Sequence, residues 1–111
     1  MKLPNADAVE IELRKVQHYL LSPKHSTGRH KARFFATLGF TQTSTPEFIS
    51  ELRRIAATED VVSVEETQLG RKYTVVGQLK GPIATALIRT IWIEERGRRF
   101  VRLVTVVPRA S

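Results

Sequence analysis

The sequence contains no cysteine, which excludes disulfide bonds and thiolate metal sites and gives no indication of an oxidising compartment. It has no apolar run near the roughly 20 residues that a membrane-spanning helix needs, and its beginning, MKLPNADAVEIELRK, lacks the apolar core of a signal peptide. Internal repeats, low-complexity tracts and linkers are also missing. We therefore expect one domain over residues 1–111, cytoplasmic and not in a membrane, although delivery into another cell within a larger protein stays open.

Acidic residues are scarce beside basic ones. The chain has 11 Asp and Glu against 18 Lys and Arg, a net charge of +7 and a pI near 10.4. Such a chain binds polyanions at low ionic strength whatever its purpose. Two interpretations follow: a surface charge that only solubilises the protein, or a surface that meets a nucleic acid or an acidic protein.

Helical periodicity marks the first half of the chain. Apolar residues at helical spacing predict three helices, over residues 9–21, 26–38 and 45–60. Residues that commonly cap or end helices stand at the boundaries: Ser22-Pro23, Ser26 or Thr27, Gly39, and Thr45-Pro46.

The second half changes to strand-like patterns separated by short turns. The expected strands cover residues 61–70, 71–80, 84–95 and 99–108, with turns at Gly70, at residues 80–83 and at residues 96–98. Sequential strands joined by short turns form an antiparallel meander. The predicted fold class is therefore α+β, with about three N-terminal helices packed on a four-stranded antiparallel meander sheet.

Polar residues interrupt the last two predicted strands near their centres. Arg89, Thr90 and Trp92 lie in the third strand, and Arg102 and Thr105 lie in the fourth. Alternation does not separate an apolar from a polar face, so periodicity alone leaves the helix-covered face unassigned. Either the arginines are simply solvated and Trp92 is part of the core, or an open face offers cations, a hydroxyl and an aromatic ring to phosphate and base.

The stretch SPKHSTGRHKARFF concentrates basic residues where the second helix is expected to begin. His25 and His30 could divide the roles of base and acid in RNA cleavage, and Arg29, Lys31 and Arg33 could stabilise the charge of the reacting phosphate. A solvated loop would carry the same residue types. The spacing of the two histidines, with no carboxylate beside them, is poor for zinc, and no cofactor-binding motif occurs, so we expect neither a metal nor a cofactor.

Two parts of the sequence share a pattern with a known family. The first part reads YLLSPKH and then GRHKARFFATLGF, and the second reads GPIATALIRTIWI and then RLVTVVP. In these motifs the chain resembles an uncharacterised family of small bacterial proteins. That family is similar to the C-terminal modules of bacterial polymorphic toxins in the barnase–EndoU–colicin–RelE superfold of RNases.

The resemblance implies a fold of helices followed by a four-stranded antiparallel sheet, and a toxin that cleaves RNA without a metal. It also implies a neighbouring small acidic, antitoxin-like protein as partner. The positions that match the motifs and are implied in function are His30, Lys31, Arg89, Thr90, Trp92 and Thr105. Val107 departs from the pattern, because the family often has an aromatic residue before the final proline.

The sequence thus predicts a metal-independent endoribonuclease toxin. The catalytic residues are expected to converge in one cleft, and they are His30, Lys31, Arg89 and Thr105. The residues expected to bind substrate are His25, Arg29, Arg33, Thr90, Trp92 and Arg102. RNA and an acidic antitoxin-like protein are the expected partners. The alternative is a non-catalytic basic module that binds RNA or an acidic protein.

Overall fold

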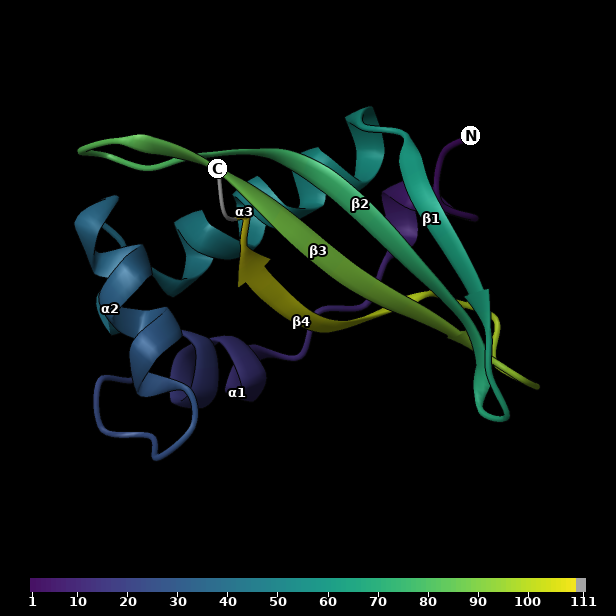
Figure 1. The fold of residues 1–111 in the computed structure, drawn as a ribbon, viewed down its shortest axis with the longest axis horizontal. Helices are drawn as coiled ribbons and strands as arrows, with labels where there is room; N and C mark the ends of the chain where they lie inside the picture. Colours follow the sequence, from purple (N-terminus) through teal and green to yellow (C-terminus); the bar gives the residue numbers. More distant parts are fainter. Residues whose placement is uncertain (110–111) are drawn as a thin grey trace.

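Three helical segments precede a four-stranded antiparallel sheet in the computed structural model, which describes residues 1–109 (Figure 1). The strands follow one another in the order β1-β2-β3-β4, which confirms the predicted α+β meander. The helical elements are α1 (Leu13–Lys15) continued by the π-helical turn η2 (Val16–Leu20), α2 (Arg29–Thr37) and α3 (Thr45–Thr58), with short 3-10 turns at Ala6–Ala8 and Gln42–Ser44. The strands are β1 (Val61–Glu66), β2 (Gly70–Lys80), β3 (Thr85–Glu95) and β4 (Arg102–Pro108).

The first helix is shorter than predicted. It begins at Leu13 and not near Val9, because the residues before it are extended and hydrogen-bonded beside β4. The amide of Glu10 donates to the carbonyl of Val101 at 2.9 Å, and the amide of Leu103 donates to the carbonyl of Glu10 at 2.9 Å. Through these hydrogen bonds the backbone of Glu10 pairs with the edge of β4. This pairing outweighs the helical pattern of the residues around Glu10.

The second helix begins at Arg29, later than predicted, and its N-cap residue is Gly28 and not Ser26 or Thr27. A histidine stabilises the turn that precedes the helix. The Nδ1 atom of His25 accepts the amide hydrogens of Thr27 at 3.1 Å and Gly28 at 3.0 Å. At the other end, Gly39 has a left-handed φ of 102° and Phe40 donates its amide to the carbonyl of Phe35. The predicted role of Gly39 after this helix is confirmed.

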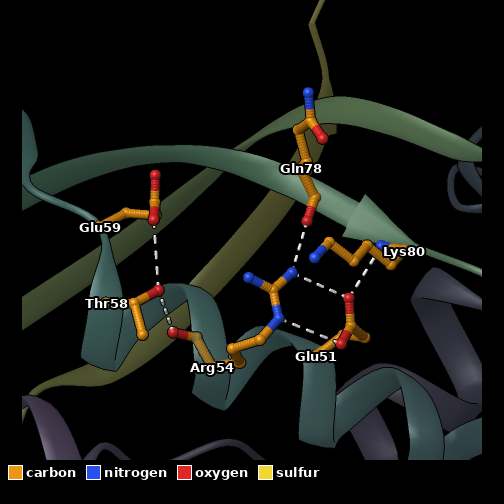
Figure 2. Close-up of polar contacts among 6 residues, drawn as sticks. All are labelled: Glu51, Arg54, Thr58, Glu59, Gln78 and Lys80. Atoms are coloured by element: carbon orange, nitrogen blue, oxygen red, sulfur yellow. Dashed lines mark hydrogen bonds and ion pairs between the residues drawn. The ribbon is translucent and has the colours of Figure 1, made fainter.

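The third helix, α3, nearly matches its predicted range of residues 45–60. It covers the inner face of β2. Gly77 allows this approach, because a Cβ there would lie 2.9 Å from the side chain of Ile55. Figure 2 shows the polar contacts beside it: Arg54 donates to the Glu51 carboxylate at 2.9 Å and to the carbonyl of Gln78 at 2.6 Å. The same carboxylate accepts the amide hydrogen of Lys80 at 2.8 Å, so the pair fixes α3 to the end of β2.

The structure assigns the two faces of the sheet that alternation left open. Ile88, Thr90 and Trp92 of β3 point toward the helices and are 0% exposed, whereas Arg89 is exposed on the outer face. The Trp92 indole donates to the Thr90 hydroxyl at 2.8 Å, and that hydroxyl donates to the carbonyl of Val75 at 2.8 Å. Thr90 and Trp92 therefore belong to the core and do not lie on the open face where the sequence prediction placed them as substrate-binding residues.

A β-bulge sets the orientation of β4. Ile91 pairs with Thr105 while Trp92 pairs with Leu103, so Val104 is an extra residue between them. The alternation of β4 changes phase there. Leu103 is consequently buried with Trp92, and Thr105 lies on the outer face with Ile91.

The strand β1 forms the other edge of the sheet and is exposed along most of its length. Val62 and Val64 are 62% and 47% exposed, and Glu65 and Glu66 follow them. Only the start of the strand has a backbone partner beyond β2 among the described residues, since Val61 donates its amide to the carbonyl of Met1 at 2.7 Å.

Within residues 1–109, no helix is long and apolar enough to cross a bilayer.

Candidate functional site

A lysine of α2 meets a threonine of β4 at the edge of the sheet. The Nζ atom of Lys31 donates to the Oγ1 atom of Thr105 at 2.8 Å, across 74 residues of sequence. The two elements lie side by side (Figure 1), and the Lys31 ammonium also lies 5.4 Å from the centre of the Tyr19 ring. The edge of the Tyr19 ring packs against His25, with ring centres 4.8 Å apart. This contact unites two of the four predicted catalytic residues.

Thr105 also borders a hollow on the outer face of the sheet. The hollow has a volume of about 620 Å³ and is lined by residues of β1 to β4, among them Lys72, Thr74, Ile91 and Thr105. Arg89 lies on the same face, two residues along β3 from Ile91 and opposite Val107. Residues placed diagonally on neighbouring strands are within reach of long side chains, so Arg89 can reach a group bound beside Thr105.

A second lysine, Lys15, is hydrogen-bonded to the backbone of the β4 bulge. The Nζ atom of Lys15 donates to the carbonyls of Val104 at 2.9 Å and Leu103 at 3.4 Å. Burial lowers the pKa of this ammonium, and the neighbouring positive charge of Arg102 lowers it further. The contact fixes the turn of the backbone that presents Thr105 to the outer face. Sequence reasoning missed Lys15, because nothing in its spacing distinguishes it from any exposed lysine of a helix.

The histidines occupy different positions from those expected of a joined acid–base pair. His25 uses Nδ1 to accept the amide hydrogens of Thr27 and Gly28 in the turn before α2, which leaves its Nε2 atom as the nitrogen available to a ligand. His30 is exposed on α2, and within residues 1–109 no hydrogen bond or ion pair joins it to Lys31, Arg89 or Thr105. Successive helical residues point about 100° apart, so His30 and Lys31 face different directions.

Comparison with known proteins identifies the family. The model of the family described as "Domain of unknown function (DUF6883)" matches residues 2–110, nearly the whole chain. The chain belongs to the DUF6883 family. No curated protein matches it significantly.

A solved structure shares the fold of this DUF6883 chain. It is a chain from a "Contact-dependent growth inhibition toxin - immunity protein complex from Klebsiella pneumoniae 342", with a TM-score of 0.71 and 12% sequence identity. The match covers 89% of the DUF6883 chain and 98% of the other chain. At this identity the similarity shows a common fold.

The remaining basic residues of the DUF6883 chain do not join the Lys31–Thr105 contact. Arg102 on β4 forms an ion pair with Glu95 at 2.7 Å, and Arg102 holds the pKa of the Glu95 carboxyl below its usual range. Arg29 and Arg33 line a different hollow beside α2. Arg29 and Lys31 are two residues apart on α2, which places them about 200° apart around the helix axis. The residues expected to bind substrate therefore do not form one surface, since Thr90 and Trp92 lie in the core and Arg29 and Arg33 lie beside α2.

Proposed function

We propose that the chain is a toxin domain that cleaves RNA without a metal ion, on the outer face of its sheet beside Thr105. The single observation that carries the proposal is the Lys31–Thr105 hydrogen bond at the border of an open hollow, next to the exposed Arg89. It brings a cation and a hydroxyl together on a surface that a nucleic-acid strand can reach. The net charge of +7 supplies long-range attraction for such a strand.

The proposed reaction is attack of the ribose 2′-oxygen on the adjacent phosphorus. A base removes the 2′-hydroxyl proton, the bond to the 5′-oxygen breaks, and an acid gives that oxygen a proton, which leaves a 2′,3′-cyclic phosphate and a 5′-hydroxyl. Lys31 and Arg89 would stabilise the negative charge that develops on the phosphorane, and the Thr105 hydroxyl would orient a non-bridging oxygen. We assign proton transfer to His30, an exposed imidazole of α2. Because its side chain points about 100° away from that of Lys31, the bound RNA would have to contact both side chains around the helix.

The toxin assignment draws on the structural neighbour. Its complex contains a toxin and an immunity protein, and this chain shares the fold of one of its chains. A strongly basic chain suits the member that attacks a polyanion, and an acidic protein would complement its charge. We therefore propose an acidic partner that neutralises the domain.

One observation favours a second candidate function. Since no contact among the described residues links His30 to the Lys31–Thr105 pair, the same face could bind RNA without cleaving it. Binding without cleavage needs only the cations and not the proton-transfer groups.

Cleavage of a labelled RNA by the purified chain in EDTA tests the proposal. We expect cleavage to persist in EDTA, and His30→Ala to lower its rate on the order of 10²–10⁴-fold, as loss of a general acid or base does. Arg98→Ala, in the exposed turn before β4, is the matched control and should have only a small effect.

Expression in bacteria gives the second readout. The parent should arrest growth, and His30→Ala should relieve the arrest. RNA binding with no cleavage by the parent would support the second candidate, and strict dependence on magnesium would contradict the proposed chemistry.

A further inference from the structure

We propose that the groove beside α2 is a docking site for an acidic helix of a partner protein, separate from the Lys31–Thr105 surface. The groove has a volume of about 450 Å³. It lies between α2 and residues 40–43, with Leu21 and Pro23 at one end. The inference goes beyond the proposed function, because binding here requires no cleavage of RNA.

The floor of the groove is apolar. Leu21, Ala32 and Phe40 contribute to it, and each of these residues is no more than 5% exposed. Ala36 lies one helical turn beyond Ala32 and is exposed, so the groove opens to solvent along the helix. The apolar surface of the groove that is still open to solvent belongs to Pro23 and Ala36, and a large apolar side chain, such as leucine or phenylalanine, would remove it from water.

Two exposed arginines line the edge of the groove. Arg29 and Arg33 are four residues apart on α2 and therefore lie on one side of it, one turn apart. Both are exposed, and within residues 1–109 neither guanidinium has a hydrogen-bond or ion-pair partner. Carboxylates four residues apart on a partner helix have the same spacing of about 6 Å and can pair with both arginines. This repeat along the groove favours a helix as the occupant.

RNA fits the groove less well than an acidic helix does. A single strand binds by stacking its bases on open aromatic faces, but the Phe40 ring is only 1% exposed. Phosphates gain nothing from the apolar floor. Lys31 points about 200° away from Arg29 around the helix, so a strand bound at Thr105 does not extend naturally to the groove.

The geometry leads to a specific arrangement. An acidic helix in the groove would leave the outer face of the sheet uncovered, because the two surfaces lie on opposite sides of α2. Partner and RNA would then bind at the same time. Binding at the groove would also survive substitutions that abolish activity at the sheet face.

A designed peptide tests the groove directly. The probe is a fluorescent helical peptide of about four turns, with leucines on one face flanked by glutamates one turn apart, and its control has lysines in place of the glutamates. We expect saturable binding of the glutamate peptide, measured by fluorescence anisotropy, and none of the lysine peptide. No saturable binding of the glutamate peptide below about 1 mM would overturn the inference.

Paired variants separate the groove from general attraction by positive charge. Arg29→Glu with Arg33→Glu should raise the Kd about 30-fold or more, since carboxylates would then face carboxylates. Arg96→Glu with Arg98→Glu makes the same change of charge in an exposed turn and should raise the Kd about threefold or less. Equal effects of the two double variants would overturn the inference.

Two further measurements test the alternatives. Ala36→Trp fills the groove without changing the charge and should abolish peptide binding, whereas an undiminished affinity would overturn the inference. An RNA oligonucleotide should not displace the peptide, and displacement would show that RNA is the occupant. A dimer in sedimentation that Ala36→Trp breaks would show that a second copy of the chain is the occupant. Lys31→Met should bind the peptide like the parent, so failure of the nuclease proposal and failure of this one are distinguishable.

Discussion

The ammonium of Lys31 and the hydroxyl of Thr105 are 2.8 Å apart, although one belongs to a helix near the start of the chain and the other to the last strand. Their contact depends on the bulge at Val104, which turns Thr105 away from the core. Lys15 fixes the same bulge through the carbonyls of Leu103 and Val104. The reactive groups of the proposed site are thus held by backbone geometry as well as by side chains.

Lys31→Met and Thr105→Val should each lower RNA cleavage by about 100-fold or more, because each removes a group placed beside the phosphate. Both variants should remain folded, with the free energy of unfolding changed by about 1 kcal/mol or less, since the lost hydrogen bond is only partly buried. Initial cleavage rates and urea unfolding provide the two measurements. Lys24→Met, in the exposed loop before α2, is the control. A loss of activity in Lys24→Met as large as that in Lys31→Met would contradict the site.

Thr90→Val should destabilise the fold by about 1–3 kcal/mol, because it leaves the buried indole N–H of Trp92 without its acceptor. The near-isosteric valine keeps the volume, so the effect comes from the lost hydrogen bonds and not from a cavity. Thermal or urea unfolding measures the change. RNA affinity of the folded variant should equal that of the parent. A specific loss of RNA affinity with unchanged stability would return Thr90 to the binding surface.

Glu51→Gln should lower stability at neutral pH by about 1–2 kcal/mol, because the carboxylate accepts charge-assisted hydrogen bonds from Arg54 and an amide hydrogen from Lys80. Arg54 holds the pKa of this carboxyl below its ordinary value. A carboxyl with a lowered folded pKa stabilises the fold above its unfolded pKa and loses this contribution as the pH falls through the folded pKa. The difference between parent and variant should therefore shrink from about pH 5 downward in urea unfolding. A difference that grows in acid would be inconsistent with this role.

Gly28→Ala should destabilise the fold by about 2–3 kcal/mol, because the new Cβ would lie 2.1 Å from the carbonyl oxygen of Tyr19, a backbone atom with little freedom to move. Gly97→Ala is the matched comparison. Its Cβ meets nothing within 4 Å, and its φ of 78° costs only about 1–2 kcal/mol in a non-glycine residue. Melting temperatures of the two variants check the order, and a Gly28→Ala protein as stable as Gly97→Ala would contradict the close packing of α2 on the first helix.

Much of the fold could be predicted from the sequence, because local signals and tertiary packing agree there. Gly39 ends α2 and Pro46 lies in the first turn of α3, as their backbone preferences require. The start of the first helix could not be predicted, because Glu10 is paired with a strand that follows about ninety residues later along the chain.

The candidate site could be predicted only in part. The basic stretch and the motif residues Lys31 and Thr105 were identified, but strict alternation places Thr105 and Leu103 on one face. The bulge at Val104 breaks that alternation and puts them on opposite faces. Trp92 resembles a ligand-stacking residue in the sequence, yet the Thr90 hydroxyl satisfies its polar atom inside the core. Such long-range arrangements leave no pattern in neighbouring residues.

The exposed edge of β1 has a consequence for the behaviour of the protein at high concentration. An open strand edge with apolar residues such as Val62 and Val64 invites pairing with a strand of another molecule and, from there, fibre growth. Glu65 and Glu66 follow them, and Asp60 precedes them, in a chain that otherwise has an excess of positive charge. Asp60 forms an ion pair with Lys2, and Glu66 forms one with Arg71, so this edge carries charged side chains that would have to leave water when two copies meet edge to edge. Charged side chains thus flank the apolar part of this edge and oppose self-aggregation.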